Sequence, residues 1–190
     1  MSAAVQTDIK KELMQLQDKY RIALLSAYAL ALHGFEYLLP TPIPWLRLGF
    51  ANIITLVTLI LYGFRTALTV TLIRVLLGSI FTGTFLGPAF ILSFGGGLSS
   101  VAAMGLVHRI FKRLFGPVGL SMIGAFFHNT VQLILAYFLF IQRVEAVILI
   151  SPIIIFAGTL TGVVNGVVSD ILINKLLKKS DDTVQNVSPV

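Results

Sequence analysis

The chain has 190 residues, of which 56% are hydrophobic and 12% are charged, and its mean hydropathy is +0.92. A soluble domain carries about 25% charged residues, so this composition excludes an ordinary soluble protein. The absence of cysteine excludes disulfides and thiolate metal ligands. A net charge of +6 is compatible with nucleic-acid binding, but these basic residues lie at the ends of apolar runs, as they do in membrane proteins.

Six apolar runs divide the chain, and each is close to the ~20 residues that a helix needs to cross ~30 Å of hydrocarbon. The runs are residues 22–39, 48–64, 66–86, 89–107, 118–141 and 147–173. Continuous runs of this length are too long for the strands of a membrane barrel. We therefore expect an all-α polytopic membrane protein with one six-helix transmembrane domain over residues 22–179.

The N-terminal segment, residues 1–21, precedes the first run. It combines charged residues with Ile9, Leu13 and Leu16, and this spacing predicts a short amphipathic helix that anchors the chain at the membrane surface. The first run also resembles a signal peptide, with Ala27 and Ala29 at a cleavage-site spacing. Cleavage would leave five spans and an external N-terminus, against the charge bias of the remaining loops, so we favour an uncleaved first span.

The basic residues fall on one side of the predicted helices. With the N-terminus in the cytoplasm, eleven of the fourteen Lys and Arg residues lie inside, Arg47 and Arg143 lie in outer loops, and Arg74 lies within the third run. Such an asymmetry over short loops predicts six spans with both termini cytoplasmic. The polar tail, residues 180–190, has no periodic apolar face and is predicted to be disordered.

Three segments interrupt the apolar runs. Residues 39–47 contain three alternating prolines, which predict a stiff extended cap on the outer side, and residues 83–88 predict a turn. Residues 95–97 are three consecutive glycines, which favour either a broken helix or very close helix packing. Small residues also repeat every fourth position, and we expect most of them to serve helix packing. These are Ala23, Ala27 and Ala31 in the first run and Gly158, Gly162 and Gly166 in the last.

Polar residues inside the predicted spans are the candidate binding residues, because a charge at the bilayer centre costs at least about 2.5–3.5 kcal/mol. Arg74 lies nine residues beyond the boundary residue Arg65, near mid-membrane, and requires a partner. We expect Glu36 to be the carboxylate that can reach Arg74. Arg74 is then either a substrate contact or a structural brace that is paired with Glu36. The other candidates are His33, Asn52, His128, Asn129, Gln132 and Asn165, and we expect the set to line one cavity that opens to the outside.

Four stretches resemble the bacterial family called Gx transporters, which is also known as heptaprenyl diphosphate synthase component I. They are PTPIPWLRLGFANIITL (41–57), RVLLGSIFTGTF (74–85), SFGGGLSSVAAMGL (93–106) and GPVGLSMIGAFFHNTVQL (116–133). That family is similar in turn to the S components of energy-coupling factor (ECF) transporters, which bind substrate in an outward-facing pocket of a six-helix bundle. The resemblance implies a bacterial inner-membrane protein.

The resemblance also implies a role for particular residues. It makes Ala23, Ala27 and Ala31 a docking face for a transmembrane coupling subunit, and residues 39–47 a cap over the pocket. It makes Arg47, Asn52, Arg74, His128, Asn129 and Gln132 the polar motif residues, to which the buried positions add His33 and Glu36. The function that we expect is substrate binding in an uptake transporter, for a small anionic or amphipathic molecule held by Arg74 and Arg47.

Two other functions stay open at this point. The chain could be a non-catalytic membrane partner of a prenyl diphosphate or quinone-synthesising enzyme, or an assembly partner in a membrane redox complex. It has no DDxxD pair for a magnesium-bound diphosphate and no nucleotide-binding loop, since Gly95-Gly-Gly-Leu-Ser lacks the lysine. We therefore expect no enzyme activity, no metal and no cofactor, and we expect any ATP-driven step to come from another chain.

Overall fold

The computed structural model describes residues 3–38, 49–111 and 114–187, and every regular element in these residues is helical. The elements in chain order are α1 (Ala3–Leu38), α2 (Ala51–Tyr62), α3 (Phe64–Phe81), α4 (Pro88–Phe111), α5 (Pro117–Ala136), the π-helical turn η1 (Tyr137–Ile141) and α6 (Val144–Val187). The prediction of an all-helical bundle is confirmed.

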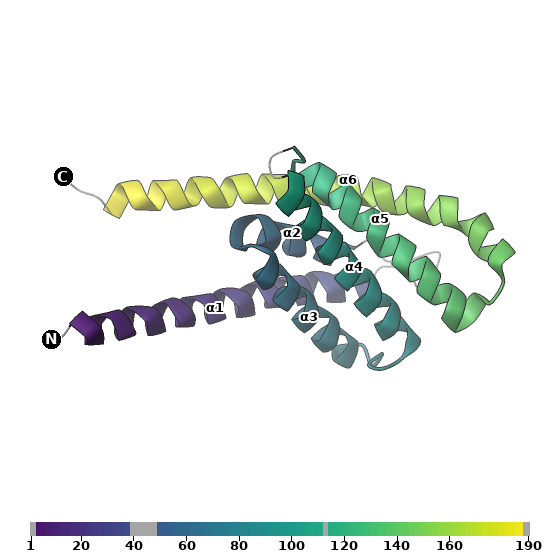
Figure 1. Ribbon diagram of the computed structural model, residues 1–190, viewed down its shortest axis with the longest axis horizontal. Helices are drawn as coiled ribbons and strands as arrows, with labels where there is room; N and C mark the ends of the chain where they lie inside the picture. The colour runs from purple at the N-terminus through teal and green to yellow at the C-terminus, as the bar shows by residue number, and fades with distance from the viewer. Residues whose placement is uncertain (1–2, 39–48, 112–113, 188–190) are drawn as a thin grey trace.

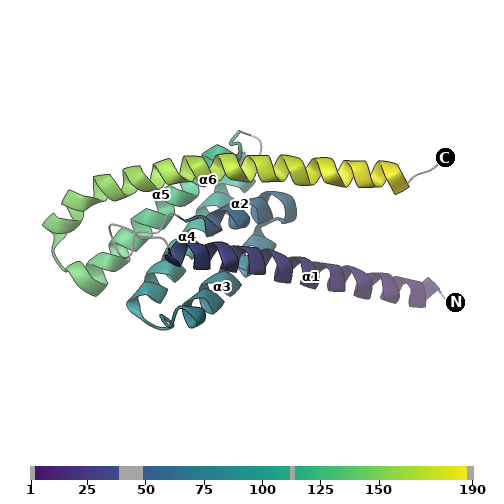
Figure 2. The ribbon, with the colours of Figure 1, turned by 180° about the vertical axis from the view of Figure 1, so that it is seen from behind.

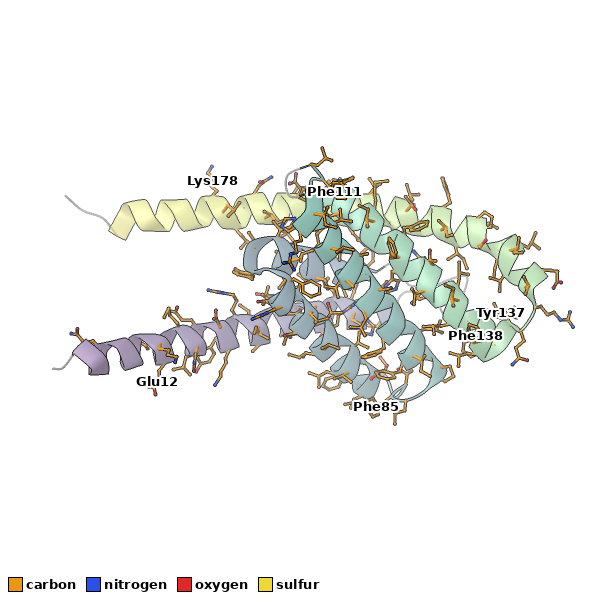
Figure 3. All side chains as sticks on the ribbon, in the orientation of Figure 1. Glu12, Phe85, Phe111, Tyr137, Phe138 and Lys178 are labelled. Atoms are coloured by element: carbon orange, nitrogen blue, oxygen red, sulfur yellow. The ribbon has the colours of Figure 1, made fainter. Side chains whose placement is uncertain are left out.

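Both termini lie at the same end of the molecule (Figure 1). The first part of α1 and the last part of α6 project past the other helices there, and the opposite view shows the same arrangement (Figure 2). Glu12 and Lys178 mark the two projections (Figure 3). We call this the terminal end of the bundle. Its position on the cytoplasmic side stays a prediction from the charge distribution.

Among the described residues, four helices are long and apolar enough to cross a membrane, which makes the chain a multi-pass membrane protein. They cover Phe64–Phe81, Pro88–Phe111, Pro117–Ile141 and Val144–Lys178. In the most apolar 18-residue stretch of each helix, only 17% to 39% is buried within the chain. Leu149 and Phe156 of α6 are more than 70% exposed. Such a surface is suited to lipid. The apolar helix α2 has only 12 residues, or about 18 Å, which is too short to cross the hydrocarbon. Helix α1 is not among the helices that are long and apolar enough to span, so six complete spans stay a prediction.

Two boundaries differ from the sequence prediction. Residues 3–21 are not a separate surface helix, because α1 runs from Ala3 to Leu38 without a break. No glycine or proline occurs between these positions before Gly34, so nothing in the sequence ends the helix at residue 21. The tail was predicted to be disordered from residue 180, but α6 continues to Val187. The first helix-breaking residue there is Pro189, and extending an existing helix costs far less than starting one.

An apolar core holds the terminal half of the bundle together. It consists of Leu56, Leu59, Ala67, Val101, Met104 and Leu120, from α2, α3, α4 and α5. The glycines of α6 bring that helix against α5: a Cβ atom at Gly166 would lie 2.5 Å from the Val118 Cα, and one at Gly162 would lie 2.9 Å from the Ala125 Cβ. The prediction that the four-residue glycine repeat serves packing is therefore confirmed for these two positions.

Candidate functional site

Four of the predicted polar residues meet in one cavity. His33 and Glu36 of α1, Arg74 of α3 and His128 of α5 line it, and all four side chains are buried. The remaining lining residues are Gly49, Val75 and Ser93. The cavity has a volume of about 20 Å³, room for about one water molecule. The structure thus brings these four residues together, while their role in binding a substrate stays a prediction.

The two α1 residues reach the cavity because they lie one turn apart on the same helix face. His33 also depends on a glycine of α3, since a Cβ atom at Gly78 would lie 2.6 Å from the His33 Cδ2 atom. Real Cβ atoms do not approach other atoms this closely. Gly78 therefore allows α1 and α3 to approach with the imidazole between them.

The three consecutive glycines of α4 serve the same purpose. The helix is continuous from Pro88 to Phe111, so the broken-helix alternative is wrong and the close-packing alternative is confirmed. A Cβ atom at Gly96 would lie 3.0 Å from His128 Nδ1, and one at Gly97 would lie 3.4 Å from an Arg74 Nη atom. Glycine at position 96 therefore lets the imidazole lie directly on the α4 backbone, whereas Arg74 lies at ordinary contact distance from position 97.

Gly49 forms one wall of the cavity, and its backbone is held from two sides. Its N–H group donates a hydrogen bond to the Glu36 carboxylate. Its carbonyl accepts hydrogen bonds from the Asn165 side chain of α6 at 3.1 Å and from the Asn52 N–H at 2.8 Å. The φ angle of Gly49 is +73°, in the region that favours glycine. Residues far apart in the sequence therefore fix the start of α2.

The shortness of α2 explains why backbone reaches the cavity. Gly49 precedes α2 and lines the same cavity as Arg74, which lies in the middle of α3. Because α2 has only 12 residues and ends at the terminal end of the bundle, its first residues lie beside the middle of α3, at the level of Arg74. The sequence analysis missed Gly49 and Ser93 as cavity residues. The available signal for Gly49 was a glycine directly after a proline-rich segment, which indicates a turn.

The other predicted residues lie outside the cavity. Asn129 is buried, donates to the Ala125 carbonyl at 2.8 Å and faces Gly158 of α6, so it contributes to the α5–α6 contact. Gln132 is buried and lies against Gly96. Asn52 is half-buried beside Gly49. The predicted contact residue Arg47 and the proline-rich cap, residues 39–47, lie outside the described residues.

The three alanines of α1 all lie on its exposed side. Ala23, Ala27 and Ala31 are exposed, whereas Ser26 and Ala29 are buried against the bundle. The described helices therefore leave this face of small residues open. Close approach by a helix of another chain requires such a face.

The cavity offers both donors and acceptors of hydrogen bonds. It combines one carboxylate, one guanidinium group and two imidazoles with a backbone wall. Within the described ranges, no group of three or more His, Cys, Asp or Glu residues has a geometry that would hold a metal ion. Arginine presents planar donors that suit a carboxylate or a phosphate, and the Glu36 carboxylate accepts from N–H or O–H donors.

Comparisons with known proteins agree with this arrangement. A solved structure of the S component of a bacterial ECF transporter has the same fold, with a TM-score of 0.59 and 21% sequence identity over 90% of this chain and 98% of that chain. No curated protein matches the sequence. The profile of the family described as heptaprenyl diphosphate synthase component I matches residues 25–172, and the chain belongs to this family.

Proposed function

We propose that the protein is the substrate-binding membrane component of an uptake transporter for a small molecule with an acidic group. The observation that carries this proposal is Arg74, which is only 4% exposed and lines a cavity between helices of an S-component fold. A buried intramembrane cation is costly, so a binding role is the default interpretation. The protein itself is proposed to be no enzyme, because its sequence offers no diphosphate–magnesium or nucleotide motif.

The chemistry of the cavity refines the ligand. Arg74 receives the carboxylate or phosphate of the ligand, because a charge-assisted hydrogen bond is stronger away from water. Glu36 lines the same cavity, so a ligand with acidic groups alone would meet a carboxylate. The matching ligand carries an N–H, O–H or ammonium donor beside its acid, and His33 and His128 orient it.

Entry of this ligand requires the cavity to open. Sites for small molecules typically have volumes of about 300–1,000 Å³, far more than the ≈ 20 Å³ here. The wall that moves is Gly49, since a ligand donor at Glu36 replaces the Gly49 N–H. Residues 39–47, directly before Gly49, are the proposed gate, with Arg47 as a second anion contact.

Energy and direction come from partners. The exposed face of Ala23, Ala27 and Ala31 is the proposed docking site for a transmembrane coupling subunit that associates with ATPases, as the S-component fold suggests. With both termini in the cytoplasm, in the inner membrane of a bacterium, the polar cavity opens outward and transport runs inward.

The test compares three proteins purified gently from their own membranes: the wild type, Arg74→Gln and the matched control Arg143→Gln, which removes an exposed arginine. Native mass spectrometry identifies retained small molecules and partner chains. We expect an acidic small molecule on the wild type and on Arg143→Gln but a loss of at least tenfold in Arg74→Gln. Equal retention by Arg74→Gln, with unchanged folding, would exclude Arg74 as the anchor.

A second candidate function is a non-catalytic membrane partner of a prenyl diphosphate synthase. The family description, heptaprenyl diphosphate synthase component I, favours it. In the same experiment this function predicts a co-purifying soluble synthase, with no small molecule that depends on Arg74. Co-purification of a coupling subunit and ATPases supports the transporter instead.

A further inference from the structure

A second, larger cavity lies at the terminal end of the bundle, apart from the polar cavity. It has a volume of about 440 Å³ and lies between α2, α3 and α4. Its apolar lining includes Leu59, Phe64, Ala102 and Leu106, and its polar residues are His108 and Arg109. We call it the α4 groove. It shares no lining residue with the cavity around Arg74.

The groove opens toward lipid rather than toward the core. Leu106 is 59% exposed and Phe64 is 42% exposed, and both belong to helices that are long and apolar enough to span a membrane. Gly105 forms part of the floor, where a Cβ atom would lie 2.8 Å from the Phe64 Cε2 atom. Because Gly105 has no side chain, the Phe64 ring packs directly against the α4 backbone. This close packing leaves a groove in the surface beside Leu106.

The polar end of the groove lies at the membrane boundary. Helix α4 has 24 residues, or about 36 Å, which exceeds the ~30 Å of hydrocarbon. Arg109 is exposed and lies in the last turn of α4, which ends at Phe111 (labelled in Figure 3). The His108 Nδ1 atom is buried and makes no hydrogen bond with the part of the chain that the structure describes. Adjacent residues in the last turn of α4 therefore carry an imidazole and a guanidinium group beside an apolar groove, where the helix length predicts headgroup depth.

We propose that the α4 groove binds one anionic phospholipid of the adjacent leaflet. One acyl chain lies along Phe64, Ala102 and Leu106, and the phosphate accepts hydrogen bonds from Arg109 and from His108. Lipid tails are as apolar as the groove walls, so burying the chain gives little gain over the bilayer. The attraction between the headgroup charge and Arg109 decides occupancy, and this makes the site selective for anionic lipid.

The test uses wild-type protein in detergent, titrated with phosphatidylglycerol or with phosphatidylcholine of identical chains, and native mass spectrometry to count bound lipids. We expect one retained phosphatidylglycerol and much weaker retention of phosphatidylcholine. Arg109→Gln is expected to lower phosphatidylglycerol affinity about fivefold, the effect of one basic residue at an anionic surface. The control Lys175→Gln removes an exposed cation of the same end from α6 and is expected to change little.

A second pair of variants tests the groove itself. Ala102→Phe places a ring in the groove and is expected to remove the tightly bound lipid, whereas Val164→Phe on the exposed side of α6 is expected to keep it. Equal loss in Arg109→Gln and Lys175→Gln would overturn the proposal, because it indicates general surface charge. Retention by Ala102→Phe would overturn it as well, and so would preferential binding of farnesyl diphosphate over phosphatidylglycerol.

Discussion

The two halves of the bundle differ in what the same helices bury. Toward the terminal end, α3, α4 and α5 contribute Ala67, Val101, Met104 and Leu120 to an apolar core. About two turns farther along, α3 and α5 contribute Arg74 and His128 to the polar cavity, together with His33 and Glu36 of α1. The character of the interior thus changes along the helices, not between them.

This difference separates the half that holds the fold together from the half that we propose to bind a ligand. In the terminal half, close-packed side chains such as Leu56 and Met104 stabilise the bundle through contacts that no ligand needs to break. In the polar half, buried charges are costly and the wall at Gly49 depends on hydrogen bonds that a ligand can replace. We therefore expect the proposed opening of the polar half to leave the apolar half intact.

The largest effect is expected in the apolar half. Met104→Ala removes a side chain that is 1% exposed, and such truncations cost about 2–5 kcal/mol because a cavity remains. The free energy of unfolding in mixed micelles measures it. The control Leu149→Ala truncates a side chain that is 76% exposed and is expected to cost far less. Equal costs would show that the core does not carry the stability.

An intermediate effect is expected in the polar half, as coupling between Glu36 and Arg74. Either single change to glutamine leaves an opposite charge in the cavity, whereas the double variant removes both charges. We expect the double variant to be more stable than the two single effects predict, by about 0.5–3 kcal/mol.

The matched control for that cycle combines Arg74→Gln with Glu145→Gln, which changes an exposed carboxylate in the first turn of α6. These two effects are expected to add. Additivity for Glu36 and Arg74 as well would mean that the cavity does not couple the two charges.

The smallest effect is expected where the halves meet. The Thr55 and Thr71 hydroxyls, from α2 and α3, are hydrogen-bonded at 3.2 Å and are both buried. Hydrogen bonds between membrane helices contribute about 0.6 kcal/mol on average, so Thr55→Val is expected to lower the unfolding free energy by that amount. Thr69→Val, at an exposed hydroxyl that bonds to the Arg65 carbonyl within α3, is the control. A cost above that of Met104→Ala would contradict this ranking of the halves.

Sequence patterns predicted the helices and part of the site for a clear reason. Apolar runs of spanning length leave the backbone no alternative to helix, and a charge such as Arg74 in mid-run stands out against them. The helix ends were less predictable, since continuous α1 and the extension of α6 to Val187 depend on the absence of helix breakers. Asn129 looked like a binding residue but lies in the α5–α6 contact, because a periodic pattern does not show which neighbour a helix face meets.

The sequence by itself determined that this is an all-helical membrane protein with polar residues inside its apolar runs, because hydropathy, charge bias and motifs are local properties of the chain. Only the tertiary structure decided that His33, Glu36, Arg74 and His128 share one cavity and that Gly49 closes it. That arrangement depends on close approaches at Gly78 and Gly96. Which helices approach so closely is a property of the packed bundle, since it requires that complementary faces from distant parts of the chain meet.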